Sequence, residues 1–270
     1  MAATWKERDG IQALHLTSLE ALGGVGALFT GRVRGVSPRW QEGLNWSYSV
    51  GDDPGAVREN RRRTLALLGL PVHRAAMAGL VHGDRVVAVT GEEEPAGPDD
   101  LILIPECDAL ITDRTGLALV VTAADCVPVY LYDPVRRAVG VAHAGWRGTV
   151  AGIAGKAARA MAATYGCRPD QIHAAVGPSI GPCCYEVDEA VAKPLRDYYG
   201  AAAAELLLPG RAPGKYQLDL WEANRRDLLA AGVGVVSVAG ECTSCRVERL
   251  FSHRAERGGA GRGAAVIALL

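Results

Sequence analysis

Three apolar runs between residues 115 and 149 constrain the fold of this chain more than any other stretch. Residues 117–121, 127–132 and 138–142 are rich in Leu, Val, Ala and Tyr, and residues that favour turns separate them. Short apolar runs with such boundaries are typical of buried β-strands. The thiol of Cys126 follows the first run, and the imidazole of His143 follows the third. We therefore predict strands that bring two reactive side chains to their ends.

Strand and helix patterns alternate irregularly along the rest of the chain. Apolar runs predict further strands at residues 12–18, 26–34, 172–176, 233–238 and 264–269. Helical spacing and end signals predict helices at residues 56–68, 149–165, 188–199 and 218–229, with Thr149 as the N-cap of the second. No internal repeat is found. These patterns predict an α+β (mixed α/β) fold, with residues 1–270 forming one domain.

Composition limits the classes of partner. The formal net charge of −1 gives no field that would attract nucleic acid or an anionic membrane, so we expect neither as a partner. The arginines at 58 and 61–63 are predicted to form a solvated helix face. Seven cysteines in a long chain favour reduced thiols, and the N-terminus lacks the pattern of a signal peptide. We therefore expect a cytoplasmic protein. Separately, residues 91–100 are acidic and rich in Gly and Pro, so we expect them to form a surface loop.

His82, Cys126 and His143 are the strongest candidates for chemistry. A thiolate and two imidazoles suit zinc or copper, and three protein ligands leave a fourth position open. The same atoms also suit a nucleophile pair, in which Cys126 attacks, His143 acts as base, and Asp125 or Asp84 orients the imidazole. A buried structural cysteine with two hydrogen-bonded histidines is a third interpretation. Spacing does not separate these possibilities, although Gly83 favours a tight turn that leaves His82 at a strand end.

Two further patterns have both a functional and a structural interpretation. Arg147 lies where a helix is predicted to begin, which suits an anion such as phosphate, or it packs on the ring of Trp146. Cys242-x-x-Cys245 with His253 resembles part of a structural zinc site or a redox pair. The adjacent Cys183 and Cys184 are interpreted as a packed thiol pair rather than a disulfide.

Several longer motifs follow one another in a specific order. They are NWSYSVGDD at 45–53, VHGD at 81–84, DALITDRTGLALVVTAADCVPVYLYD at 108–133, HAGWRGTVAGI at 143–153, AVGPSIGPCCYEV at 175–187, LDLWEANRRDLL at 218–229 and FSHR…GR at 251–262. In this order they resemble the laccase-domain, or polyphenol oxidase, family of bacterial YfiH-type proteins. The resemblance covers nearly the whole chain.

The resemblance implies a mixed α/β fold with a metal site, usually zinc or copper, at His82, Cys126 and His143. The family's first description was as oxidases. Its members are also described as purine nucleoside phosphorylases that act on adenosine, inosine and methylthioadenosine, with adenosine deaminase activity. A role in peptidoglycan editing is attributed to some, and a cysteine hydrolase or amidase would fit that role.

The residues can be compared with the chemistry that the resemblance implies. Deamination needs a metal-activated water, which an open three-ligand zinc site supplies. Phosphorolysis needs a held phosphate, for which Arg147, Arg32, Arg61 and the loop around Ser179 are the expected contacts. A laccase with three copper centres would need more histidines than the six present. We therefore expect nucleoside chemistry, with a nucleoside and phosphate as partners of a monomer or homodimer.

Overall fold

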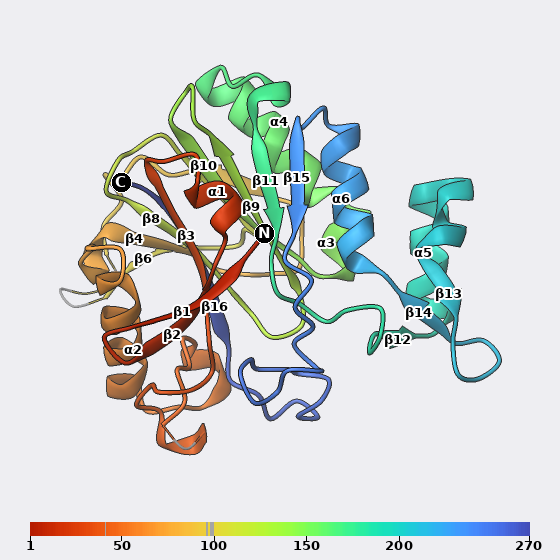
Figure 1. The fold of residues 1–270 in the computed structure, drawn as a ribbon, viewed down its shortest axis with the longest axis horizontal. Helices are drawn as coiled ribbons and strands as arrows, with labels where there is room; N and C mark the ends of the chain where they lie inside the picture. Colours follow the sequence, from red (N-terminus) through yellow and green to blue (C-terminus); the bar gives the residue numbers. More distant parts are fainter. Residues whose placement is uncertain (41, 96, 98–99) are drawn as a thin grey trace.

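Two β-sheets packed face to face form the centre of the molecule, with helices on their outer sides (Figure 1). The structure is a computed structural model that describes residues 1–40, 42–95, 97 and 100–270. The first sheet has seven strands in the order β1 (Thr4–Arg8), β2 (Ile11–His15), β3 (Val25–Thr30), β16 (Gly263–Leu269), β8 (Ala118–Ala123), β4 (Ala75–Ala78) and β6 (Ile102–Ile104). Within it, β4 runs parallel to both of its neighbours, and the other pairs are antiparallel.

The second sheet has six strands and is also mixed. Its order is β15 (Val235–Val238), β11 (His173–Val176), β9 (Val127–Asp133), β10 (Ala138–Ala144), β7 (Ala109–Thr112) and β5 (Val86–Ala88). The pairs β11–β15 and β5–β7 are parallel, and the others are antiparallel. The mixed α/β fold predicted from the sequence is confirmed.

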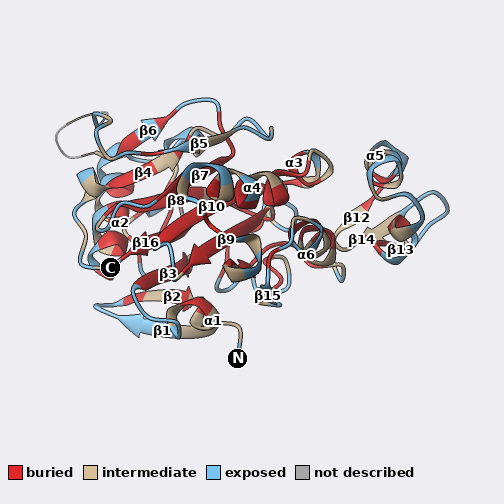
Figure 2. Ribbon diagram, turned by 90° about the horizontal axis from the view of Figure 1, so that it is seen from above, coloured by how far each residue is buried: buried red, intermediate tan, exposed pale blue. Residues whose placement is uncertain are grey.

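The core lies between the sheets, where the central strands are buried and the edge strand β1 is exposed (Figure 2). Val121 of β8 and Ile267 of β16 share one hydrophobic cluster with Val141 of β10. Tyr130 also crosses between the sheets, because its hydroxyl donates to the carbonyl oxygen of Leu28 at 2.9 Å. Alternating residues of β8 point to this core or to the outer face, as period-two patterning requires.

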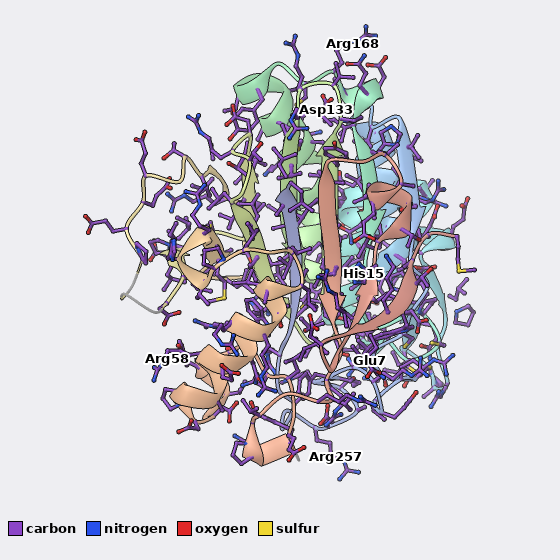
Figure 3. The ribbon with its side chains drawn as sticks, turned by 60° about the vertical axis from the view of Figure 1, so that its left-hand side comes forward. Glu7, His15, Arg58, Asp133, Arg168 and Arg257 are labelled. Atoms are coloured by element: carbon purple, nitrogen blue, oxygen red, sulfur yellow. The ribbon has the colours of Figure 1, made fainter. Side chains whose placement is uncertain are left out.

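Helix α2 (Pro54–Ala66) covers the outer face of the seven-stranded sheet. Asp53 caps it by accepting from the amide of Ala56, so the helix begins and ends two residues earlier than predicted. Arg58 lies on the outer side of the helix, as Figure 3 shows. The predicted arginine face is wrong at one position, because Arg61 is only 1% exposed and points into the fold.

Helices α4 (Ile153–Tyr165) and α6 (Leu220–Ala230) pack on the six-stranded sheet. The single helix predicted over residues 149–165 is wrong. The segment forms α3 (Trp146–Val150) and α4, and Gly152 interrupts it with a φ of 74°. Thr149 lies inside α3, where its hydroxyl accepts from the side-chain amide of Asn224 at 3.0 Å, instead of capping α4.

A small third sheet projects to one side of the sandwich together with α5 (Glu189–Tyr199) (Figure 1). Its strands are β12 (Glu186–Val187), β14 (Tyr216–Leu218) and β13 (Leu207–Pro209). A short helix, α1 (Thr17–Glu20), joins β2 to β3. The predicted acidic loop at 91–100 includes residues 96, 98 and 99, which are outside the described part of the chain. Among the helices of the described part, none combines the length and the apolar character that crossing a membrane requires.

The chain crosses from one sheet to the other at Asp125-Cys126, between β8 and β9. Asp125 has a φ of 90°, and its carboxylate holds this corner by accepting from Thr243 Oγ1 at 2.6 Å, Ser252 Oγ at 2.8 Å and the amide of Arg254 at 2.6 Å. These bonds bind the corner to two segments from the end of the chain. The reactive thiol is therefore at the junction of the two sheets.

Candidate active site

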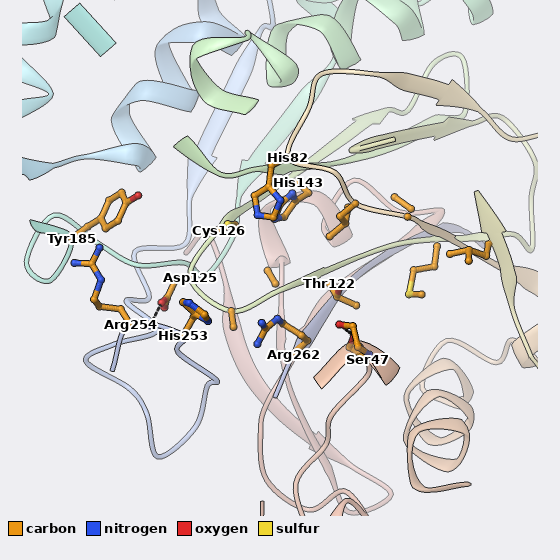
Figure 4. A pocket seen from close by; sticks show the side chains of 18 residues that line it. Ser47, His82, Thr122, Asp125, Cys126, His143, Tyr185, His253, Arg254 and Arg262 are labelled. Carbon is orange, nitrogen blue, oxygen red and sulfur yellow. Dashed lines mark hydrogen bonds between the residues drawn. The ribbon is translucent and has the colours of Figure 1, made fainter. Parts of the chain in front are cut away.

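His82, Cys126 and His143 converge at this junction. Their donor atoms all lie within 4.8 Å of one another, and the two imidazole rings are 4.9 Å apart with an interplanar angle of 84°. His82 comes from the loop after β4, Cys126 from the corner between the sheets, and His143 from β10 itself. The register of β9 and β10 pairs Val127 with Ala144, which places Cys126 beside His143. Figure 4 shows the three side chains together at one end of a cavity.

Asp108 organises both histidines. Its carboxylate accepts the amides of Val81 at 3.2 Å, His82 at 3.0 Å and Gly83 at 2.7 Å. These three bonds hold the loop while His82 itself adopts a left-handed φ of 60°. The positive φ of this tight turn thus falls on His82 rather than on Gly83, and the carboxylate offsets its strain.

The same carboxylate orients His143. Nδ1 of His143 lies 2.9 Å from Oδ1 of Asp108, so Nε2 is the ring nitrogen left for a metal or for the thiol. Burial alone would raise the pKa of Asp108, but the bonds from His143 and Gly83 outweigh it and lower this pKa. The sequence offered Asp84 or Asp125 for this orienting task. Asp84 instead pairs with Lys156 on the surface.

Cys126 and His143 form a strongly coupled pair without a metal. Burial disfavours the thiolate, yet His143 and His82 outweigh it and lower the pKa of Cys126 to about 6. Burial likewise disfavours the imidazolium, but Cys126 and Asp108 raise the pKa of His143 to about 9. A thiolate beside an imidazolium is therefore the expected state near neutral pH.

A cavity of about 700 Å³ opens in front of the three donors. Its polar lining includes Ser47, Thr122, Tyr185, His253, Arg254 and Arg262 (Figure 4). This volume is within the range of small-molecule sites. The structure places His253 here, although the sequence suggested it as a partner of Cys242 and Cys245.

Arg254 and Arg262 bring positive charge to the cavity. Arg254 donates to the carbonyl oxygen of Glu186 at 2.8 Å, and its guanidinium lies 5.1 Å from the ring centre of Tyr185. Arg262 donates to the backbone oxygens of Ala260 and Gly261 at 2.8 and 3.0 Å. Neither guanidinium pairs with a carboxylate within the described residues, so both retain donors for an anion. Burial lowers the pKa of Arg262, but a guanidinium remains charged at neutral pH.

Two of the predicted phosphate contacts are used inside the fold. Arg32 donates to the carbonyl oxygen of Val247 at 2.7 Å and to Glu256 at 3.1 Å. Arg61 is buried and pairs with Asp100 at 2.6 Å. Neither residue lines the cavity.

The other two predicted contacts, Arg147 and Ser179, are also outside the lining. Arg147 is exposed, and its guanidinium lies 4.4 Å from the ring centre of Trp146, the structural alternative given above. Ser179 is fully buried, where its hydroxyl accepts from the indole nitrogen of Trp221 at 2.6 Å. The two arginines of the cavity, Arg254 and Arg262, come from the FSHR…GR motif, and no local pattern in the sequence marks them as phosphate contacts.

The donor set fits a metal ion. Two imidazoles and a thiolate are ligands that zinc accepts, and copper takes the same donors. A carboxylate bonded to a ligating histidine, as Asp108 is to His143, is the usual support of such a ligand. Three donors beside a cavity leave one coordination position accessible, which is the arrangement of reactive rather than purely structural sites.

Comparison with known proteins relates this site to a family. The family model of the multi-copper polyphenol oxidoreductase laccases matches residues 26–270. A relative from Geobacillus stearothermophilus, named purine nucleoside phosphorylase YlmD, is 44% identical over 229 residues, which are 83% of this chain and 82% of the relative. A purine nucleoside phosphorylase of Deinococcus radiodurans is 40% identical over 89% of this chain and 88% of its own.

Solved structures agree with these matches. The crystal structure of YlmD from Geobacillus stearothermophilus has a TM-score of 0.90 and 38% identity, and the match covers 98% of each chain. The Bacillus licheniformis protein YfiH also has a TM-score of 0.90, with 36% identity over 98% of this chain and 99% of that chain. The chain therefore belongs to the multi-copper polyphenol oxidoreductase laccase family, whose similar members include proteins named purine nucleoside phosphorylase.

Proposed function

We propose that this protein is a metal-dependent purine nucleoside phosphorylase. Its reaction would convert adenosine, inosine or methylthioadenosine and phosphate into the free base and ribose 1-phosphate or methylthioribose 1-phosphate. One observation carries the proposal: a single cavity contains the three-donor cluster together with the guanidinium groups of Arg254 and Arg262. The names of the relatives support the same reaction class.

Different cavity residues are assigned to phosphate binding and to proton transfer in phosphorolysis. Arg254 and Arg262 hold phosphate, one oxygen of which attacks C1′ of the ribose while the bond from C1′ to the purine nitrogen breaks. The electron pair of that bond leaves with the purine, which then needs a proton. His253 is the cavity's imidazole outside the donor cluster, and we assign it that proton transfer.

His82, Cys126 and His143 would hold the metal, with zinc the first choice and copper the second. When bound, zinc supplies a Lewis acid beside the reacting groups. Asp108 keeps His143 in the tautomer and orientation that leave Nε2 as the donor. We propose adenosine deamination as a side activity, because a three-ligand zinc site is also the type used for that reaction.

The zinc-loaded protein, incubated with inosine and inorganic phosphate, tests the main proposal. We expect hypoxanthine and ribose 1-phosphate in equal amounts, and no hypoxanthine when phosphate is omitted. Equal release of hypoxanthine without phosphate would indicate a hydrolase instead. With adenosine, release of ammonia tests the deaminase activity separately.

A metal-free cysteine hydrolase, such as an amidase acting on peptidoglycan precursors, is the second candidate. The lowered pKa of Cys126, the raised pKa of His143 and the carboxylate of Asp108 behind the imidazole favour it. This alternative predicts no stoichiometric zinc and loss of activity after alkylation of Cys126. A laccase-type polyphenol oxidase ranks lower, because only three of the chain's six histidines line the cavity.

We also propose that the chain works in the cytoplasm as one domain, either as a monomer or as a homodimer. All seven cysteines are free thiols, which suits a reducing compartment. The net charge of −1 supports small-molecule partners rather than nucleic acid or a membrane surface.

A further inference from the structure

A second group of sulfur atoms gathers outside the cavity. Cys183 and Cys184 lie in the loop after β11, and Cys242 and Cys245 lie in the loop after β15. The four Sγ atoms all lie within 4.8 Å of one another. Cys245 Sγ is 3.5 Å from Cys183 Sγ and 3.4 Å from Cys184 Sγ. Four of the seven thiols are thus brought together from positions about 60 residues apart.

Backbone bonds, rather than the thiols, hold the two loops together. The strands before them, β11 and β15, are parallel neighbours, and a bridge between Ser179 and Cys242 continues their pairing. The amide of Ser179 donates to the backbone carbonyl oxygen of Glu241 at 3.2 Å, and the amide of Thr243 donates to the backbone carbonyl oxygen of Ser179 at 3.1 Å. The fold therefore presents the four cysteines in place before any bond between them forms.

We propose that Cys183, Cys184, Cys242 and Cys245 bind one zinc ion in a structural site separate from the active site. Four sulfurs at a Zn–S distance of about 2.3 Å form a tetrahedron with edges of roughly 3.8 Å. The observed separations of 3.4 and 3.5 Å are close to that edge. Cys242-x-x-Cys245 is a spacing that zinc sites use, and the amide of Gly181 donates to Cys242 Sγ at 3.2 Å, as the support of a thiolate ligand requires.

Charge gives a reason for a cation among these sulfurs. Thiolates whose sulfur atoms lie within 4.8 Å of one another repel, and a divalent metal ion bound between them neutralises that charge.

A zinc ion here would be accessible and would stabilise one wall of the active site. Cys183 and Cys245 are exposed, and a cavity of about 400 Å³ lies over them, which gives the ion an entry path. Cys184 is followed by Tyr185, whose ring stacks with Arg254 in the main cavity. Loss of the ion would loosen this wall without removing a group from the three-donor cluster.

Zinc stoichiometry in matched variants tests the proposal. The reduced chain is loaded with zinc, freed of excess ion and measured by elemental analysis. We expect about two zinc ions per wild-type chain, and about one in Cys245→Ser and in Cys242→Ser. The double variant His82→Ala with His143→Ala should keep about one, and Cys107→Ala, which removes a buried lone thiol, should keep about two.

Thiol alkylation of the wild-type chain avoids dependence on variants that fail to fold. In the zinc-loaded protein, Cys183 and Cys245 should resist iodoacetamide, and a chelator should expose them, as peptide mass spectrometry would show. The proposal is wrong if these exposed thiols react at the same rate before and after chelation. It is equally wrong if the His82→Ala, His143→Ala variant holds no zinc, or if the reduced protein re-forms a disulfide within the group while excess zinc is present.

Discussion

The described part of the chain contains two groups of metal-type donors, and they differ in the features that separate a reactive metal site from a structural one. His82, Cys126 and His143 offer three donors that face a large cavity, whereas Cys183, Cys184, Cys242 and Cys245 offer four sulfurs near the surface. A three-donor site leaves a position for a substrate or water, but a four-donor site fills the tetrahedron. The same fold thus combines an open group at the junction of its sheets with a closed group between two loops.

The hydrogen bonds made to the donors also differ between the open group and the closed group. Asp108 fixes the histidines of the open group by accepting one side-chain and three backbone hydrogen bonds. In the closed group the backbone amide of Gly181 donates directly to a sulfur. A carboxylate behind an imidazole adjusts the donor's basicity and orientation, whereas an amide beside a sulfur stabilises a thiolate. The number of donors and the groups that hydrogen-bond to them together distinguish a reactive metal site from a structural one.

Removal of a donor from the open group should have the largest effect. His143→Ala is expected to reduce kcat/KM for inosine phosphorolysis by about 10³-fold or more, because it deletes a proposed metal ligand and a partner of Cys126. His73→Ala, which removes an exposed histidine that does not line the cavity, is the control. Equal activity of the two variants would contradict the assignment of the open group.

Removal of the orienting carboxylate should have the next largest effect. Asp108→Asn is expected to weaken zinc binding and lower kcat/KM by about 10- to 100-fold, as losses of such partners do elsewhere. Asp84→Asn is the matched control, since Asp84 lies two positions after His82 but pairs with Lys156 instead of a histidine. A larger loss in the control would assign the orienting role to Asp84, contrary to the structure.

Substitution of the cavity arginines should act on phosphate. Arg254→Lys and Arg262→Lys are each expected to raise the KM for phosphate by about tenfold, because Lys lacks the planar fork that holds two oxygens. Arg147→Lys should change this KM much less, since Arg147 is exposed and lies over Trp146. Steady-state kinetics at saturating inosine measures all three. An increase confined to Arg147→Lys would restore the phosphate contact that the sequence suggested.

The pH dependence of alkylation distinguishes the two groups in metal-free protein. The pKa of Cys126 is lowered to about 6, so its thiolate forms as the pH rises through that value. Its alkylation rate should therefore be about tenfold higher at pH 7 than at pH 5, and nearly constant above pH 7. Cys245, with a pKa raised to about 11, should react increasingly up to much higher pH. Equal profiles measured by peptide mass spectrometry would contradict this difference.

Local patterns predicted much of the fold but not the contacts between distant segments. The apolar runs located β8, β9 and β10 because their side chains are buried along most of each strand. The sequence did not predict the interruption between α3 and α4 at Gly152, because a glycine in a helical pattern can adopt either a negative or a positive φ. The strands β8 and β9 follow one another in the sequence but belong to different sheets, and no local pattern indicates this change of sheet.

The three donors of the active site could be predicted because each lies in a recognisable sequence motif, whereas the groups that support them could not. His82 was a candidate from its residue type, but the family resemblance implied that it meets Cys126, because 43 residues lie between the two and no periodicity connects them. Asp108 was missed because a carboxylate before a strand has no local mark of its partners. The pairing of Cys183 with Cys245 depends on parallel strands β11 and β15, whose adjacency the sequence does not encode locally.

Anomalous diffraction at the zinc edge, from crystals of the zinc-loaded chain grown with phosphate, tests the open donor group most directly. We predict a strong peak within bonding distance of His82, Cys126 and His143, with phosphate bound at Arg254 and Arg262 in the same cavity. A second peak should lie among the four sulfurs. Absence of a peak at the three-donor cluster in crystals that show the second one would contradict the assignment of this cluster as the reactive metal site.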